Sequence, residues 1–337
     1  MMPDLVATNS RRLTNNITLQ HIFVAQQTIR RIAHITPLVR SASLSTQLGA
    51  AVYLKMETVQ PVGSFKIRGA ANKILNLTDE AKIPGVVTAS TGNHGRAVAY
   101  MAQTIGIPAV VCLSELVPQN KVGALQQLGA EVIIYGQSQD EAEVHTRHLV
   151  QERHLTMIHP FDDPFVIAGQ GTIGLELLQD LPDIDTALVP VSGGGLIAGI
   201  ALALKSTNPA IRVIGISMEH APVMAESLAV GEPVQMPEAP TLADSLQGGI
   251  GLENQYTFRL VRDLVDDILL VSEEEIAAAM AFALHEHHLV VEGAGAVGIA
   301  ALRAEKVSVG GQNVALIVSG GNADIPQLLQ IAQQYHR

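Results

Sequence analysis

The sequence of 337 residues has no tryptophan and only one cysteine, Cys112. A lone cysteine cannot form a disulfide within the chain, which fits a protein of a reducing compartment. Cys112 lies in the apolar segment 109–113, where we expect it to pack in a strand and not to act as a nucleophile. Apolar stretches of about 18 residues, which a membrane-spanning helix needs, are absent, and residues 1–22 lack the features of a signal peptide. These absences predict a cytoplasmic protein without a membrane partner.

Positive charge is also scarce. The chain has 21 lysines and arginines against 32 aspartates and glutamates, a formal net charge of −11. It contains no basic run that would neutralise a phosphate backbone, so we predict no nucleic-acid partner. His285 and His288 lie three residues apart on a predicted helix and have no third ligand nearby, so no metal is predicted there.

Hydrophobic residues make up 47% of the chain, enough for a large core, and they fall into short runs of alternating type. The predicted strands lie near 107–113, 130–135, 186–191, 211–217, 266–271 and 312–318. The predicted helices lie near 94–104, 119–128, 165–180, 196–206, 273–288 and 324–335. This alternation is typical of an α/β protein with parallel sheets.

The segment 63–70, Gly-Ser-Phe-Lys-Ile-Arg-Gly-Ala, sets Lys66 between a small hydroxyl residue, an aromatic ring and glycines. A lysine amine attacks an aldehyde only when it is deprotonated, and partial burial beside apolar groups lowers its pKa toward that state. The pattern suggests that Lys66 binds the aldehyde cofactor pyridoxal phosphate (PLP). Taken alone, the octapeptide also fits an ordinary solvated lysine.

Three further loops each follow a strand-like run. The loop 90–95 precedes a predicted helix, whose first N–H groups would bind an anion such as a substrate carboxylate, although an ordinary helix cap has the same composition. The loop 192–196, Ser-Gly-Gly-Gly-Leu, is typical of a phosphate cradle, because glycines let backbone amides close on the anion. The loop 319–322, Ser-Gly-Gly-Asn, lies near the C-terminus.

These four loops, in this order, resemble those of the fold-type II PLP enzymes, the tryptophan synthase β-like fold, and within them the serine/threonine dehydratase and serine racemase group. The resemblance runs from about residue 35 to residue 322. It implies that Lys66 carries the cofactor covalently and that Ser319 faces the pyridine nitrogen. The implied cofactor-binding residues are Phe65, Lys66, Asn93, Gly193, Gly194, Gly195, Leu196 and Ser319. The implied substrate-binding residues are Ser90, Thr91, Gly92, Asn93 and His94, and the implied catalytic residues are Lys66, Thr91 and Ser64.

The resemblance also implies two domains with the active site between them. Residues 53–150 would form a small domain inserted into a large one made of residues 1–52 and 151–337. A homodimer is the expected assembly. The chain ends 15 residues after Asn322, so we expect no C-terminal regulatory domain and no inhibition by isoleucine.

The implied reaction is an elimination on a small amino acid. The cofactor stabilises the carbanion left when the Cα proton is removed, and Lys66 is the expected base. The neutral hydroxyl of Ser319 holds the ring protonated less well than a carboxylate would, which favours β-elimination over transamination. A threonine- or serine-like substrate would then give a 2-oxo acid and ammonia, as in the ammonia-lyases.

Two departures from the family pattern narrow this expectation. Thr91 stands where serine racemases have a second serine, which weakens racemisation without excluding it. The cation site of that pattern keeps Glu219, but Val223 and Ala225 occupy its other positions, so no metal is predicted. The segments 91–96 and 291–296 resemble the branch called hydroxyectoine utilisation dehydratase. The alternatives that stay open are a racemase, a β-replacement enzyme, a 3-hydroxyaspartate dehydratase and an inactive amino-acid-binding module.

Overall fold

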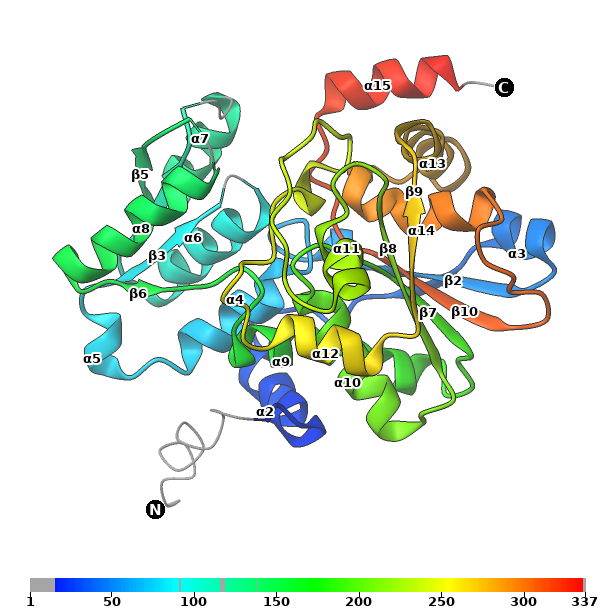
Figure 1. Cartoon of the computed structure of the whole chain (residues 1–337), viewed down its shortest axis with the longest axis horizontal. Helices are drawn as coiled ribbons and strands as arrows, with labels where there is room; N and C mark the ends of the chain where they lie inside the picture. Colours follow the sequence, from blue (N-terminus) through cyan, green and yellow to red (C-terminus); the bar gives the residue numbers. More distant parts are fainter. Residues whose placement is uncertain (1–15, 91, 116–118, 138, 336–337) are drawn as a thin grey trace.

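The computed structural model describes residues 16–90, 92–115, 119–137 and 139–335. These residues form an α/β structure with two sheets, one on either side of the molecule (Figure 1). The larger sheet has six strands, in the spatial order β1 (Leu38–Arg40), β2 (Ala51–Met56), β10 (Asn313–Val318), β7 (Thr186–Pro190), β8 (Arg212–Met218) and β9 (Asp267–Val271). Its neighbouring strands are parallel except for the antiparallel pair β1 and β2.

Helices cover both faces of the larger sheet. Strand β10 shows why: Val314, Leu316 and Val318 belong to one apolar core, while Ala315 and Ile317 belong to the other, because successive side chains of a strand point to opposite faces. The first core is completed by α3 (Ala42–Leu48), α13 (Glu273–His287), α14 (Gly293–Arg303) and α15 (Ile325–Gln334). The second is completed by α2 (Leu19–Ile29), α9 (Pro164–Asp180), α10 (Gly195–Thr207), α11 (Val223–Val230) and α12 (Thr257–Leu264).

The smaller sheet has four parallel strands, in the order β5 (Glu131–Ile134), β4 (Ala109–Leu113), β3 (Val86–Ala89) and β6 (Thr156–Met157). Helices α4 (Lys66–Leu75), α6 (Asn93–Ile105) and α7 (Gln119–Gln127) share one core, and α8 (Gln139–Arg153) packs on the opposite face. Cys112 lies fully buried in β4, as the apolar run around it predicted. The short helix α5 (Asp79–Lys82) and the 3₁₀ turns η1 (Glu57–Val59) and η2 (Asp244–Leu246) complete the described elements.

Each strand and helix predicted from the sequence is present, with its ends within two residues. The proposed domain border at residue 53 falls inside β2, a strand of the larger sheet, and the border at 150 precedes β6, a strand of the smaller sheet. Within the described ranges, none of the helices has both the length and the apolar content to span a bilayer.

A buried ionic network joins the two parts of the molecule behind α4. The Arg68 guanidinium, 1% exposed, lies 2.8 Å from Glu57 and 2.6 Å from Glu176 of α9. Lys55 of β2 reaches the same Glu176 carboxylate at 2.8 Å. Helix α4 approaches α9 so closely that a Cβ at Gly69 would lie 2.5 Å from the side-chain amide of Gln170. These contacts fix the helix that begins at Lys66.

Candidate active site

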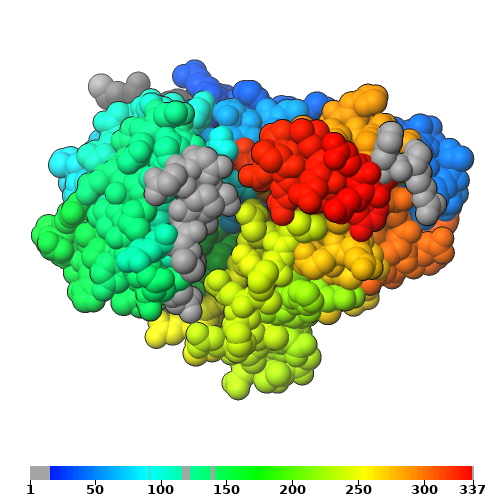
Figure 2. Space-filling view, turned by 90° about the horizontal axis from the view of Figure 1, so that it is seen from above, coloured from blue at the N-terminus to red at the C-terminus, as the bar shows by residue number. Residues whose placement is uncertain are grey.

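A large cleft lies where the loops of the two sheets meet. Its volume is about 1160 Å³, and it is lined from the smaller sheet by the loop after β3 and from the larger sheet by the loops after β7 and β10. The space-filling view shows a hollow between the green and the yellow-green parts of the surface (Figure 2). The carboxyl ends of parallel strands are the usual place for ligand sites in α/β proteins.

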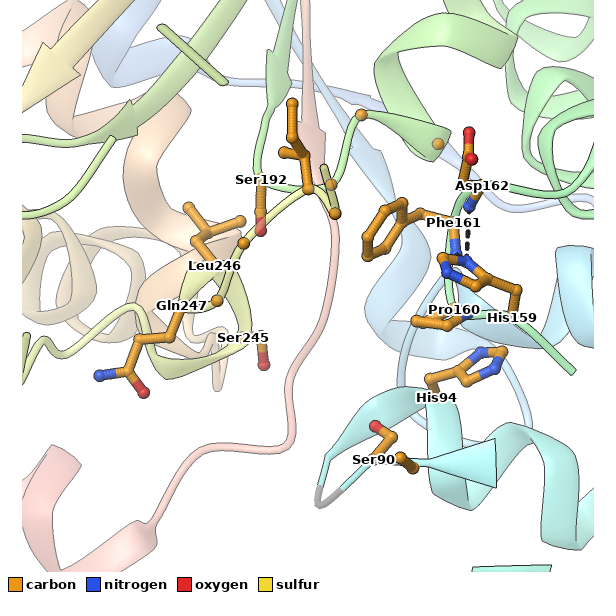
Figure 3. A pocket seen from close by; sticks show the side chains of 18 of the residues that line it. Ser90, His94, His159, Pro160, Phe161, Asp162, Ser192, Ser245, Leu246 and Gln247 are labelled. Atoms are coloured by element: carbon orange, nitrogen blue, oxygen red, sulfur yellow. Dashed lines mark hydrogen bonds between the residues drawn. The ribbon is translucent and has the colours of Figure 1, made fainter. Parts of the chain in front are cut away.

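The close view shows which segments face each other across this cleft. Ser90 and His94 lie on the same side as the segment 159–162, while Ser192 and the segment 245–247 lie opposite (Figure 3). The cleft is therefore bounded by both sheets, and a small ligand bound there would contact both parts of the molecule.

Lys66 is the first residue of α4, and its side chain enters this cleft. Its Nζ donates a hydrogen bond to the Pro160 carbonyl oxygen at 3.0 Å and lies 5.2 Å from the centre of the Phe65 ring. Burial lowers the pKa of Lys66 to about 8, and the nearby charge of Glu292 opposes this shift. The amine is therefore much more readily deprotonated than that of a surface lysine.

The loop that carries Pro160 is held at both ends. His159 Nδ1 accepts hydrogen bonds from the backbone N–H groups of Phe161, at 3.3 Å, and Asp162, at 2.8 Å (Figure 3). The Asp162 carboxylate accepts three backbone N–H bonds, from residues 255, 256 and 257 at the start of α12. The acceptor of the Lys66 amine is thus part of a fixed loop.

The glycine loop lies between β7 and α10. A Cβ at Gly193 would overlap the Phe161 ring, and Gly194 has a φ of +86°, a conformation that favours glycine. Gly195 is the first residue of α10, whose first N–H groups have no intrahelical acceptors. Gly193, Gly194, Gly195 and Leu196 all line the cleft, so the helix presents its positive end to a ligand there.

Asn93 and His94 are the first two residues of α6 and both are buried. The Asn93 amide donates to Glu292 Oε1 at 2.6 Å and accepts from Asn322 Nδ2 at 2.6 Å. His94 Nε2 lies 2.9 Å from the Ile158 carbonyl oxygen, and its Nδ1 has no hydrogen-bond partner among the described residues. Burial, with a contribution from the Lys66 charge, lowers the pKa of His94 to about 3, so its ring is neutral at pH 7.

The two predicted serines have different positions. Ser319, 3% exposed, lines the cleft, and its carbonyl oxygen accepts from the Phe65 N–H at 3.0 Å. Ser64 forms an isolated antiparallel bridge with Gly320 and is fully buried. Its hydroxyl has no partner within the described part of the chain, and Ser64 is not among the residues that line the cleft.

The remaining predicted residues converge on the same cleft. Those that line it are Phe65, Lys66, Ser90, Gly92, Asn93, His94, Gly193, Gly194, Gly195, Leu196 and Ser319. Thr91 lies outside the described residues. Glu219 lies apart from the cleft lining and is 3.4 Å from Lys306 Nζ.

Sequence reasoning missed Glu292. It is 5% exposed, precedes α14 and lines the cleft, yet its side chain does not cap its own helix. The sequence offered one signal, a carboxylate set among the apolar and small residues of segment 291–296, where a buried glutamate needs a partner.

The fold and cleft agree with comparisons to known proteins. The family model described as "Pyridoxal-phosphate dependent enzyme" matches residues 29–320. An L-threonine ammonia-lyase of Thermotoga maritima is 46% identical over 94% of this chain and 78% of its own length. A catabolic L-threonine dehydratase of Staphylococcus aureus (strain N315) is 42% identical over 94% of both chains. The solved structure of maize serine racemase is 38% identical, with a TM-score of 0.87 over 94% of this chain and 97% of that one.

The matched region spans both sheets and every predicted cofactor-binding residue from Phe65 to Ser319. The chain belongs to the family of pyridoxal-phosphate dependent enzymes, with the fold of the type II group.

Proposed function

We propose that this protein is a PLP-dependent ammonia-lyase that converts a threonine- or serine-like substrate to a 2-oxo acid and ammonia. The names of its relatives support this activity. The observation that carries the proposal is the Lys66 amine, which has a lowered pKa and shares one cleft with the glycine loop and Ser319.

The described residues fit the cofactor. The start of α10 offers N–H groups and a positive helix end to a phosphate, and Gly193 leaves the backbone open where any side chain would overlap Phe161. Ser319 supplies a neutral hydroxyl on the larger-sheet side of the cleft, and Lys66 supplies the amine. When bound, PLP supplies the electron sink that stabilises negative charge at the substrate Cα.

The chain itself would move the protons and hold the substrate. The pKa of Lys66, about 8, lies close to neutral pH, so its amine can accept the Cα proton and release it again. The start of α6, where Asn93 and His94 lie, would bind the substrate carboxylate through its N–H groups. The His94 ring, held neutral, adds no positive charge to that site. The Ser319 hydroxyl, unlike a carboxylate, places no negative charge beside the ring, which favours elimination.

A substrate panel tests this proposal. The holoenzyme should release ammonia and a 2-oxo acid in equal amounts from L-threonine or L-serine. Lys66→Ala should lose this activity by several orders of magnitude and lose the visible absorption that borohydride traps, while Lys82→Ala, a lysine outside the cleft lining, should keep both. An active Lys66→Ala protein with visible absorption that borohydride can trap would refute the assignment.

Racemisation is the second candidate, favoured by the likeness to maize serine racemase. Its sequence basis is the hydroxyl of Thr91, the expected proton donor on the face opposite Lys66. Chiral analysis of remaining substrate, run beside the ammonia assay, separates the two reactions. A 3-hydroxyaspartate substrate belongs in the same panel.

We also propose a finer biological setting. The motifs at 91–96 and 291–296 support a role in hydroxyectoine catabolism, the single cysteine supports a cytoplasmic location, and the family resemblance supports a homodimer with a small domain of about residues 53–150. Light scattering of the purified protein tests the dimer, and growth of a deletion strain on hydroxyectoine tests the setting.

A further inference from the structure

Four polar side chains form an unbroken series of hydrogen bonds that ends at the cleft, where Asn93 and Glu292 are lining residues. Arg96 Nη1 donates to Asn322 Oδ1 at 2.8 Å, Asn322 Nδ2 donates to Asn93 Oδ1 at 2.6 Å, and Asn93 Nδ2 donates to Glu292 Oε1 at 2.6 Å. Arg96 and Asn93 belong to α6, which packs on the smaller sheet, whereas Asn322 follows β10 and Glu292 precedes α14. These hydrogen bonds therefore link the two parts of the molecule beside the active site.

The residues at the two ends, Arg96 and Glu292, fix the donor-to-acceptor direction of this series of hydrogen bonds. A guanidinium only donates hydrogen bonds, and an ionised carboxylate only accepts them. Asn322 is held further by a second bond from its Nδ2 to the Val62 carbonyl oxygen at 2.9 Å. Each amide between the ends can satisfy its neighbours in only one of its two orientations, since a flip would oppose two donors or two acceptors.

Glu292 is held where only a backbone without a side chain leaves room for it. A Cβ at Gly320 would overlap Glu292 Oε1, and the Glu292 N–H donates to the Gly320 carbonyl oxygen at 3.2 Å. Gly320 directly follows Ser319, so this carboxylate is fixed beside the strand end that lines the cleft. Burying a carboxylate disfavours the folded state unless it is well bonded, and a chain of this kind supplies such bonds.

We propose that Glu292 is a positioning residue that acts with Asn322 and Arg96 to hold the Asn93 amide with an N–H, and not its carbonyl oxygen, toward the cofactor. This inference rests on the proposed function and on the family resemblance, which implies that Asn93 binds the cofactor; we assign the ring oxygen of PLP as the group that Asn93 contacts. Within the described part of the chain, Glu292 accepts from one N–H of the amide and Asn322 donates to its carbonyl oxygen, so the second N–H is the group left for the cofactor. An N–H donor stabilises the ring oxygen in its anionic form.

Cofactor affinity and the holoenzyme absorption spectrum test this inference without relying on activity. Glu292→Ala should weaken PLP binding about tenfold, because the amide loses its acceptor, and should shift absorption from the visible toward the near ultraviolet as the ring oxygen takes up a proton. Glu292→Gln keeps an oxygen that accepts from Asn93 and should stay within about threefold of the parent. Asn322→Asp is nearly isosteric but sets an acceptor against Asn93 Oδ1, so it should give the largest loss. Glu286→Ala, at an exposed glutamate of α13, is the control and should change neither quantity.

A single and a double variant distinguish a failure of the proposed function from a failure of the positioning role of Glu292. Asn93→Ala alone should weaken PLP binding and shift the spectrum, and adding Glu292→Ala to it should have little further effect, because the two act through one contact. If Asn93→Ala changes neither quantity, the placement of Asn93 in the proposed function is wrong. If Asn93→Ala changes both while Glu292→Ala and Asn322→Asp change neither, the site stands and the positioning role of Glu292 is overturned.

Discussion

The Lys66 amine and the Pro160 carbonyl oxygen lie 3.0 Å apart, although 94 residues separate them in the chain. Pro160 belongs to a loop tied through Asp162 to the start of α12, while Lys66 starts a helix tied through Arg68 to α9. Contacts outside the cleft therefore fix both partners of this hydrogen bond. Among the described residues, no carboxylate forms an ion pair with the Lys66 amine, and such a pair would raise its pKa further than the nearby charge of Glu292 does.

The lowered pKa of Lys66 predicts how cofactor binding depends on pH. Only the neutral amine attacks an aldehyde, so the rate at which cofactor-free protein takes up PLP should rise with pH and level off above about 8, not above the ordinary lysine value of 10.5. Stopped-flow absorption across pH 6 to 10 measures this. A rate that keeps rising through pH 10 would show that the amine has the pKa of a surface lysine.

The charge of Glu292 also affects the pKa of Lys66. Its negative charge raises the pKa of Lys66, so Glu292→Gln should move the midpoint of the uptake rate to lower pH. The same stopped-flow series gives this midpoint. An unchanged or higher midpoint would mean that the charge of Glu292 does not reach the amine.

The glycine loop predicts a sharp difference between two alanine substitutions. A Cβ at Gly193 overlaps the Phe161 ring, so Gly193→Ala should displace the loop and reduce PLP affinity about tenfold or more. Gly123→Ala in α7 meets no atom within 4 Å and should leave PLP affinity unchanged while slightly stabilising its helix. Equilibrium dialysis of PLP compares the two. Equal affinities would show that this loop does not hold the phosphate.

The neutral hydroxyl of Ser319 predicts which reaction is favoured. Ser319→Asp would place a carboxylate at the cleft, favour a protonated ring and reduce elimination, with the cofactor still bound. Ammonia release and visible absorption are measured together. Elimination at the parental kcat and KM would indicate that Ser319 does not face the ring.

The buried network predicts a large loss of stability. Arg68→Met leaves the Glu57 and Glu176 carboxylates buried without their main partner, and should lower the free energy of unfolding by about 3–5 kcal/mol. Arg153→Met, which removes an exposed pair with Glu131, is the control and should have little effect. Urea unfolding measures the free energy of unfolding of both variants.

The same network predicts how stability depends on pH. Burial alone would raise the pKa of Glu57, but partners including Arg68 lower it below its unfolded-state value. The stability that these partners give is therefore present above the unfolded-state pKa and is lost as pH falls through the lower pKa of the folded state.

The sequence by itself determined the local parts of this protein. Alternating strand and helix patterns predicted six strands and six helices to within two residues, because side-chain periodicity reflects which face of each element is buried. The lysine motif and the glycine and asparagine loops could be recognised because tight turns and helix starts need particular residues at adjacent positions. Other elements were missed, among them α2, α8, α14 and β2. In β2 the apolar pattern is interrupted by Lys55, whose buried charge is compensated by contacts with distant residues.

Only the tertiary structure decided which distant groups meet. Glu292 contacts Asn93 across 199 positions, and Arg68 contacts Glu176 across 108, so no spacing in the sequence marks either pair. The same packing sets Ser64 behind the cleft lining although it lies two residues from Lys66. Local motifs are specified by backbone conformation over a few residues, whereas the charge, orientation and burial of the site depend on how the two sheets and their helices pack together.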